Sequence, residues 1–433
     1  MAGVSSNSNF GGANLEEGKN YTVPLTVLTS LFFMWAVATN LNDILIPHLK
    51  KACDLTDFQS SLIQSAFFAG YFLLSLPAGK IIAKVGYKNG ILIGLGLCTL
   101  GALLFIPAAS TLTFGMFLFA LCVLAGGISF LQVAANPYVA VLGKPETASS
   151  RLNLAQAFNS LGATVGPYVG ARLILSNVEK TAADLAAMTP DQIDAYRLAE
   201  GAMVKMPYLG LAGIFLAIAV LIYFSKLPVI VEAAEDESAA KGEGSAFQFS
   251  NLTFGVIAIF VYVGAEVGIG SFIIRYMQYL KIPNVTDQSA ATYISYYMFG
   301  AMTGRFIGSA LMQKIKPNKI LAFNAFFAFC LVALSIMTTG YFAVIALVLV
   351  GLMNSIMFPT IFTLAIDGLG KFTKDGSSFL IMAIVGGGVI PPIMGLISDS
   401  VNIQVSFIAP ALCYLYILFY GFMGYKKKSE IAA

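Results

Sequence analysis

The chain has 433 residues, of which 58% are hydrophobic and only 11% are charged, and its net charge is +3. Soluble domains carry about a quarter charged residues, so this composition excludes a soluble globular protein. A net charge this small gives no sign of a nucleic-acid partner, and we expect none.

Apolar stretches of about 20 residues recur along the whole chain, and this is the length of a helix that crosses a bilayer. We therefore predict an all-α polytopic membrane protein with twelve transmembrane helices. An even number of spans places both termini on the same side. The predicted spans are residues 24–48, 58–83, 89–108, 112–140, 151–176, 204–226, 252–280, 288–314, 319–338, 341–367, 374–399 and 404–424.

The distribution of basic residues indicates the orientation. Sixteen Lys and Arg residues fall in the tails and in the connections after spans 2, 4, 6, 8 and 10, whereas the opposite connections hold six. Basic connections stay on the cytoplasmic side, so we predict that both termini are cytoplasmic.

Segments outside the spans divide the chain into two six-helix halves. Residues 228–248 are acidic and rich in Ala, Gly and Ser, as is typical of a linker. The first twenty residues lack the basic start and the cleavage site of a signal peptide, so we expect the first apolar run to be retained. The predicted organisation is a tail (1–22), an N-terminal half (23–227), a linker (228–250), a C-terminal half (251–424) and a second tail (425–433).

The long connection 177–203 contains a helix start signal. Thr189 suits an N-cap, Pro190 suits the first helical position, and Gln192 completes a capping box. We predict a short surface helix that begins here.

Cysteine and histidine give no sign of catalysis. Cys53, Cys98, Cys122, Cys330 and Cys413 show no metal-ligand spacing, and most lie in apolar runs, where cysteine packs as a small apolar residue. The only histidine, His48, lies at the outer rim, at the end of the first span, and offers neither a metal site nor a triad. We expect no metal, no cofactor and no enzymatic activity.

The two halves repeat each other. GKIIAKVGYK at Gly79 aligns with GRFIGSALMQ at Gly304 at an offset of 225, and the segments around Pro137 and Pro359 align at an offset of 222. A repeat of six plus six helices is typical of transporters whose halves rock about a central site near the bilayer midplane.

The repeat pairs the polar residues that lie within the spans. Asp43 in span 1 maps to Glu266 in span 7, and Gln132 and Asn354 each lie five residues before an aligned proline. Polar groups in hydrocarbon cost several kcal/mol unless they face a partner or a wet cavity. We therefore expect these residues to surround one central cavity.

Five segments carry a family resemblance: FFMWAVATNLNDILIPHLKKA, FQSSLIQSAFFAGYFLLSLPAGKIIAKVGYKNGI, LQVAANPYVAVLG, RLNLAQAFNSLGATVGPYVG and KDGSSFLIMAIVGGGVIPPIMGLISD. Together they resemble the fucose–galactose–glucose:proton symporter family, a branch of the major facilitator superfamily, from about residue 22 to residue 420. The resemblance implies a secondary transporter in a bacterial cytoplasmic membrane that imports a monosaccharide together with protons.

The resemblance also assigns roles to residues. Asp43 matches the proton-coupling aspartate of the family, and Asn159 matches a residue that lines the sugar cavity, with Gln156 one helical turn before it. Gln132 stands where fucose-type members have a glutamate, and it cannot titrate. The LQVAANPY and YVGAEV segments look more like the glucose/galactose members, so glucose or galactose is favoured over fucose.

The remaining polar residues have two possible roles. Glu266 either accepts sugar hydroxyls or acts as a second titrating group, or it forms an ion pair with Arg275 or Arg305. Amide side chains donate and accept hydrogen bonds, which suits sugar hydroxyls, but they also join helices within membranes. Trp35 either stacks on a sugar ring or packs against helices and lipid. The predicted sugar-binding residues are Trp35, Asn40, Asn42, Gln132, Asn136, Gln156, Asn159 and Asn354.

Other functions fit the sequence less well. The expected cavity contains acids and amides but no central cation, so its substrate should be neutral. A proton-coupled drug antiporter is the nearest alternative, because acids also suit cationic drugs. A channel would need a selectivity filter, and an enzyme would need a nucleophile with a base. We expect a monomer in the bilayer whose partners are the sugar and protons.

Overall fold

The computed structural model describes residues 21–53, 57–174, 188–225, 227–228, 245–282 and 287–426, and side chains at 41–52, 57–65, 167–174, 194 and 287–291 are left out. Within this part of the chain the secondary structure is helical throughout. Nine helical stretches of the described residues are long and apolar enough to cross a bilayer. The predicted all-α membrane class is confirmed.

The helices form two groups that follow each other along the chain. The first group contains α1 (Thr22–Ala52), α2 (Asp57–Thr111), α3 (Phe114–Val141), η1 (Pro145–Thr147), α4 (Ala148–Ile174), α6 (Pro190–Met203) and α7 (Lys205–Phe224). The second group begins with η2 (Ala246–Gln248), α8 (Ser250–Tyr279), α9 (Asp287–Leu311), α10 (Pro317–Met337), α11 (Gly340–Asn354) and α12 (Met357–Ile366). It ends with η3 (Gly370–Phe372), α13 (Thr373–Met382), η4 (Ala383–Val385), α14 (Gly386–Ser400), α15 (Ile403–Ser406), α16 (Ile408–Phe419) and η5 (Tyr420–Gly424).

Each predicted span corresponds to helix, but the structure differs from the prediction at the boundary between spans 2 and 3 and within spans 10, 11 and 12. Spans 2 and 3 run together as α2, with Gly86 at φ +82° marking the turn between its two arms. Span 10 is interrupted after Asn354, and span 11 passes through the 3₁₀ turn η4. Span 12 is divided into α15, α16 and the π-turn η5.

A proline accounts for the interruption of span 10. Pro359 has no N–H, so the carbonyl of Ser355 cannot receive the usual helical hydrogen bond from the residue four positions later. Pro137 leaves the carbonyl of Val133 free in the same way in α3. Both free carbonyls accept side-chain hydrogen bonds instead, from Arg305 and Ser377 respectively.

The predicted surface helix is confirmed as α6. It begins at Pro190 after the N-cap Thr189, whose backbone N–H donates to the side chain of Gln192 at 3.0 Å. This is one arm of the predicted capping box, and it satisfies a donor that would otherwise be left free at the helix start.

The internal repeat is visible in how the helices pack. Gly162 in α4 faces the backbone oxygen of Phe33 in α1, and Gly386 faces the backbone oxygen of Phe260 in α8, each too closely for a Cβ atom. The two glycines are 224 residues apart and the two phenylalanines 227. Small residues allow membrane helices to approach in this way.

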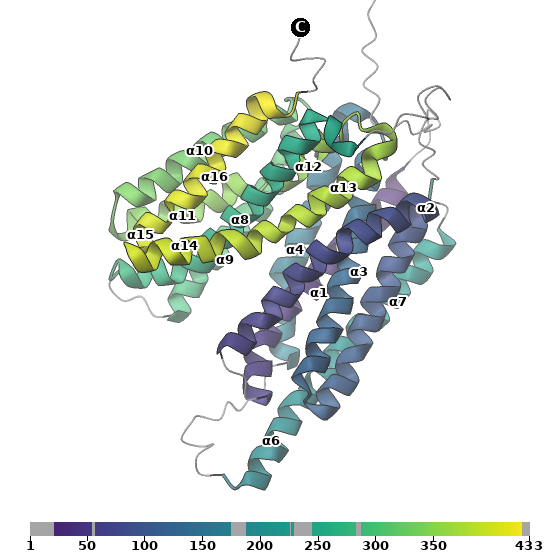
Figure 1. Cartoon of the computed structure of the whole chain (residues 1–433), viewed down its shortest axis with the longest axis vertical. Helices are drawn as coiled ribbons and strands as arrows, with labels where there is room; N and C mark the ends of the chain where they lie inside the picture. Colours follow the sequence, from purple (N-terminus) through teal and green to yellow (C-terminus); the bar gives the residue numbers. More distant parts are fainter. Residues whose placement is uncertain are drawn as a thin grey trace, which may run out of the picture.

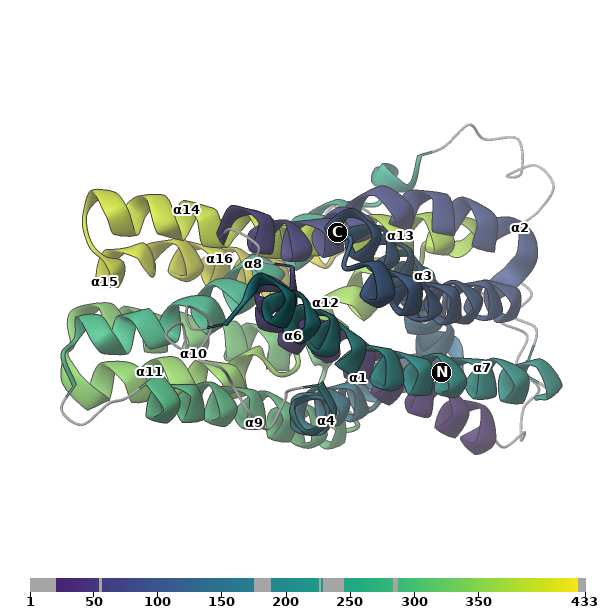
Figure 2. The same cartoon turned by 90° about the horizontal axis from the view of Figure 1, so that it is seen from below.

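The two groups meet at one end of the molecule and diverge at the other (Figure 1). We call the end where α8 begins and η5 finishes the tail end, and the opposite end, which carries α6, the far end. Ser250 donates to the backbone oxygen of Lys426 at 3.0 Å, so these two elements adjoin. Contacts between the groups join α4 to α9 and α12, and α13 to α2 and α3. Seen from below, α9 to α11 lie on one side and α3 and α7 on the other (Figure 2).

Candidate functional site

A polar chain of contacts crosses between the two helix groups. In the first group, Gln156 of α4 donates from its side chain to Asn136 of α3 at 3.4 Å. Asn136 is completely buried, and its Nδ2 has no hydrogen-bond partner among the described residues. A buried amide donor without a partner costs about 1–3 kcal/mol, which a bound polar ligand would recover.

Arg305 of α9 connects this region to the second group. Its guanidinium donates to the backbone oxygens of Ser355 at 2.9 Å and Gln156 at 3.3 Å, and to the hydroxyl of Ser160. Ser355 belongs to the second group, whereas Gln156 and Ser160 lie on α4 in the first. One side chain therefore bridges the two groups, and it puts a cation in the polar chain, where none was expected from the sequence.

Glu266 of α8 is the acidic member of the site. Its carboxyl group interacts electrostatically with Arg305 and lies beside the hydroxyl of Tyr262. Of the two arginines considered as its partner, Arg305 is the one whose charge acts on this carboxyl, whereas Arg275 lies over the ring of Phe272 at 5.3 Å. Glu266 is half-buried. An acid at this position can hold a proton or accept hydroxyl groups.

Asn354 lies in a cluster of tyrosines within the second group. Its Nδ2 donates to Tyr297 at 2.6 Å, its Oδ1 accepts from Tyr414 at 2.8 Å, and its backbone oxygen accepts from Tyr262 at 3.2 Å. It is 0% exposed. Its side chain is therefore already satisfied by protein partners, and Tyr262 links it to Glu266.

Gln132 makes the equivalent contact in the first group. Its Nε2 donates to the hydroxyl of Tyr71 at 2.9 Å, as Asn354 does to Tyr297. The tyrosines are 226 residues apart and the amides 222, so the repeat extends to this hydrogen bond. Gln132 differs in being 8% exposed.

The remaining predicted residues all lie on α1 or α4. Asn159 donates to the backbone oxygen of Phe32 at 2.9 Å, and the ring of Trp35 contacts that of Phe32 with centroids 4.1 Å apart. Trp35 is 4% exposed, so it packs among helices in this arrangement. Asn40 donates to the backbone oxygen of Ala36 within its own helix at 2.8 Å.

The NLNDILIPH segment falls outside the described side chains from residue 41 onward, and this includes three of the residues singled out from the sequence. Asn42, Asp43 and His48 belong to the helical backbone of α1, and their side-chain positions lie beyond what the structure describes. The predicted proton-coupling role of Asp43 is consequently untested by the geometry.

Several residues of this site were not predicted. Tyr71, Tyr262, Tyr297 and Tyr414 were overlooked because aromatic residues are expected in any membrane helix. The repeat spacing would have found Tyr71 and Tyr297, since a tyrosine occurs at matched positions beside both amides. Ser160 carried no signal of its own.

Buried hydroxyl groups join the two helix groups closer to the tail end. Ser149 and Thr363 lie 2.6 Å apart, Ser150 donates to the backbone oxygen of Ser309 at 2.7 Å, and Ser309 donates back to Ser150 at 2.8 Å. Ser377 adds the bond to α3 noted above, at 3.0 Å. The tail end is thus closed by hydrogen bonds.

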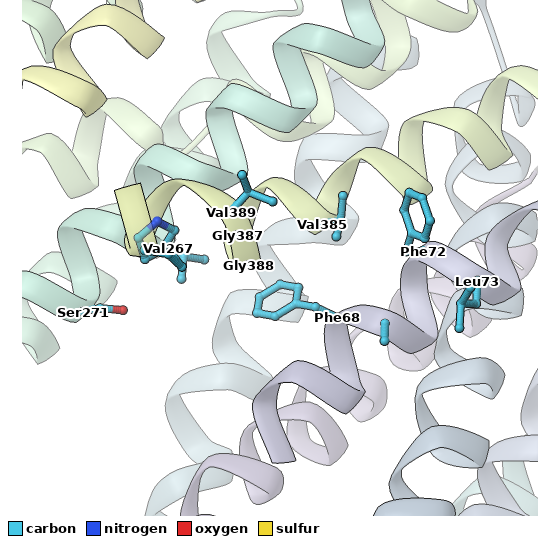
Figure 3. Close-up of a pocket in the computed structure, with 12 residues that line it drawn as sticks. Phe68, Phe72, Leu73, Val267, Ser271, Val385, Gly387, Gly388 and Val389 are labelled. Atoms are coloured by element: carbon cyan, nitrogen blue, oxygen red, sulfur yellow. The ribbon is translucent and has the colours of Figure 1, made fainter. Parts of the chain in front are cut away.

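A cavity of about 490 Å³ lies between α2, α8 and α14 (Figure 3). Phe68 projects from α2 toward Gly387 and Gly388, and Val267 and Ser271 contribute from α8. The lining is mostly apolar. It adjoins the position after Glu266 but lacks the amides and acids of the polar chain, so it is not the sugar site predicted from the sequence.

Fold and polar chain together define a two-group membrane carrier, and comparison with known proteins identifies its family. The model of the Major Facilitator Superfamily matches residues 27–383. The chain belongs to this superfamily. It is similar to a glucose/galactose transporter of Brucella abortus, with 50% identity over 94% of this chain and 96% of that protein.

Two further comparisons extend this result. The L-fucose-proton symporter of Escherichia coli is 42% identical over 94% of each chain. The crystal structure of the transporter FucP in the outward conformation has a TM-score of 0.87 and 41% identity, covering 94% of this chain and 99% of that one. The relatives are transporters and not enzymes, so both the predicted fold and the predicted class are confirmed.

Proposed function

We propose that the protein imports a neutral monosaccharide together with protons by alternating access. The observation that carries this proposal is the polar chain from Asn136 through Arg305 to Glu266, which joins the two helix groups. Its amides suit sugar hydroxyls, and its acid suits a proton. The 42% identical relative is named an L-fucose-proton symporter, and the 50% identical relative a glucose/galactose transporter.

The favoured sugars are glucose and galactose. Gln132 presents a neutral amide, whereas the fucose-type members of the resembled family have a glutamate, and the 50% identical relative is a glucose/galactose transporter. The predicted binding residues around it are Asn136, Gln156 and Asn159, with Trp35 as a ring-stacking partner. Asn354 does not contact the sugar in this proposal, because its amide nitrogen and oxygen are already hydrogen-bonded to Tyr297 and Tyr414.

The tail end faces the cytoplasm in this proposal. The excess of basic residues in the tails and in the connections on that side supports this orientation. The site would then be open toward the far end and closed by hydroxyl contacts on the cytoplasmic side, which fits the similarity to FucP in the outward conformation. In this proposal the protein lies in the inner membrane of a bacterium, and a monomer is enough for transport.

Asp43 and Glu266 carry the proton in this scheme. A neutral carboxyl crosses the low-dielectric interior at much lower cost than a carboxylate, so protonation favours the change of state. Release into the higher-pH cytoplasm restores the negative charge and resets the carrier.

The test of this function is Asp43→Asn in proteoliposomes with an imposed pH gradient and labelled glucose, galactose and fucose in competition. We expect the variant to lose sugar accumulation against a gradient and to retain sugar counterflow, which needs no net proton movement. Asp191→Asn, at an exposed acid of α6, serves as the control and should accumulate normally. Full accumulation by Asp43→Asn would contradict the proposed coupling.

A proton-coupled drug antiporter is the second candidate, because an acid within the membrane also suits a cationic substrate. Inhibition of uptake by lipophilic cations but not by free hexoses would favour it. The amides of the polar chain support the sugar instead.

A further inference from the structure

Arg305 of α9 donates hydrogen bonds to both helix groups. Its Nε is anchored on the carbonyl of Ser355, which Pro359 has released from helical bonding. Its Nη1 is thereby directed toward α4, where it reaches the backbone oxygen of Gln156 and the hydroxyl of Ser160. We call these contacts with α4 the Arg305 clasp.

The guanidinium of Arg305 that forms the clasp also interacts with Glu266. When Glu266 is a carboxylate, the guanidinium is attracted both to that acid and to the oxygens of α4. When a proton from the far side neutralises Glu266, the guanidinium loses its attraction to that acid, and its remaining acceptors are the carbonyl of Ser355 and the oxygens of α4. A proton on Glu266 therefore strengthens the clasp between the groups.

We infer that Arg305 is a positioning residue that prevents protons from crossing without sugar. This inference rests on the proposed proton-coupled sugar transport. A protonated but empty carrier is held closed at the tail end by the clasp and cannot release its proton there. Sugar hydroxyls bound at Gln156 compete for the same part of α4, weaken the clasp and allow the loaded carrier to change state.

The groups around Glu266 are consistent with this reading. Its described titratable and charged neighbours are Tyr262 of the same helix, Arg305 and Tyr297 of α9, and Tyr414 of α16. Tyrosine hydroxyls stay neutral at physiological pH. Among these described neighbours, Arg305 is therefore the one permanent charge that senses whether Glu266 is ionised.

The experiment measures proton leak without sugar. Wild-type protein and Arg305→Gln are reconstituted into vesicles with an imposed pH gradient, and its decay is followed with a pH-sensitive dye before and after glucose is added. The glutamine keeps hydrogen-bonding atoms but lacks the charge. We expect Arg305→Gln to dissipate the gradient about tenfold faster than wild type in the absence of sugar, because charged hydrogen bonds shift an equilibrium by at least this factor.

Two further variants keep the test decisive. Arg275→Gln removes another arginine of the second group, which contacts the ring of Phe272, and should leak no faster than wild type. Ser160→Ala leaves Arg305 in place and removes one acceptor of α4, so a smaller increase in leak is expected even if Arg305→Gln does not fold. Sugar counterflow by each variant verifies folding.

The outcomes separate the two proposals. If wild-type protein shows no proton uptake on addition of glucose, galactose or fucose, the proposed function fails. If wild type is coupled but neither Arg305→Gln nor Ser160→Ala leaks faster than Arg275→Gln, the inference about Arg305 is wrong.

Discussion

Gln132 and Asn354 make the same hydrogen bond in the two repeats but sit in different surroundings. Each amide nitrogen donates to a tyrosine hydroxyl, at 2.9 Å from Gln132 and 2.6 Å from Asn354. The oxygen of Asn354 also accepts a hydrogen bond from Tyr414, whereas the oxygen of Gln132 accepts none from the described residues. In the first repeat, the oxygen of Gln132 therefore remains an acceptor for a ligand. In the second repeat, the oxygen of Asn354 stabilises the protein instead.

This asymmetry predicts different effects for one chemical change. Tyr71→Phe releases the amide of Gln132 from its fixed orientation, so the KM for sugar should rise about fivefold, equivalent to about 1 kcal/mol of binding. Uptake assays with the purified protein measure this change. Its thermal stability should change little, because Gln132 keeps some access to water.

The matched variant is Tyr297→Phe. It leaves the completely buried Nδ2 of Asn354 without a partner, which costs about 1–3 kcal/mol of stability. We expect a lower unfolding temperature with little change in KM. The proposed division of roles is wrong if the two variants give the same pattern.

Residue types and spacing predicted most of the polar site. The offset between repeats paired Gln132 with Asn354, and both make the pseudo-equivalent bond. The sequence could not show which amide is saturated, because that depends on tyrosines contributed by other helices. It also offered Arg275 and Arg305 equally as partners of Glu266, and only packing places Arg305 in range.

Glycine contacts set the distance between helices of each repeat. Gly162 of α4 lies against the backbone oxygen of Phe33, so a methyl group there must push α4 away from α1. The neighbouring Asn159 donates to Phe32 across the same contact at 2.9 Å. The position of α1, and of the predicted proton carrier Asp43 on it, therefore depends on a glycine of another helix.

Gly162→Ala tests this dependence. Overpacking of a close contact costs about 1–3 kcal/mol, so we expect a lower unfolding temperature and reduced transport. Gly210→Ala in α7 is the control, because a Cβ there meets nothing within 4 Å and alanine favours the helix. Equal effects of the two substitutions on stability would mean that the α1–α4 contact is unimportant. Thermal unfolding in detergent and sugar uptake provide the two measurements.

Element positions followed from hydropathy, but their internal breaks did not. The described residues of the twelve predicted spans lie mostly in helices, because about 20 apolar residues determine a membrane helix almost alone. The break after Asn354 depends on Pro359 and on the capture of the released carbonyl by Arg305. A proline in the sequence indicates that such a break is allowed without showing whether it occurs.

Hydroxyl contacts hold the two helix groups together at the tail end. Ser149 of α4 and Thr363 of α12 approach to 2.6 Å, and both are buried. Alternating access requires this contact to separate when the tail end opens. A covalent bond at this position should therefore arrest the whole cycle.

The variant Ser149→Cys with Thr363→Cys should form a disulfide, since hydroxyls 2.6 Å apart place the Cβ atoms within disulfide range. Oxidation should abolish sugar uptake almost completely, and a reductant should restore it. Ser149→Cys alone, treated with the same oxidant, controls for the native cysteines. Continued uptake by the oxidised double variant, with the disulfide verified by mass spectrometry, would show that the tail end need not open.

The fold of each half was accessible from the sequence, whereas the relation between the halves was not. The repeat and the apolar spans describe elements and their pairing within a half. Contacts between the halves include the rings of Phe158 and Phe306, and their hydrogen bonds come from common residues such as Ser149, Ser309 and Ser377. Serines of this kind recur along the chain, so nothing in their pattern distinguishes those at the contact.

The composition of the tail-end contact has a consequence for how fast the carrier can turn over. Serine and threonine hydroxyls exchange a protein partner for a water molecule at little net free energy. Opening that end hydrates the hydroxyl groups that had sealed it. The barrier is thus the layer of hydroxyl contacts at the tail end, which water can replace. Turnover is limited by the sugar and protons, whose binding determines when this layer is hydrated.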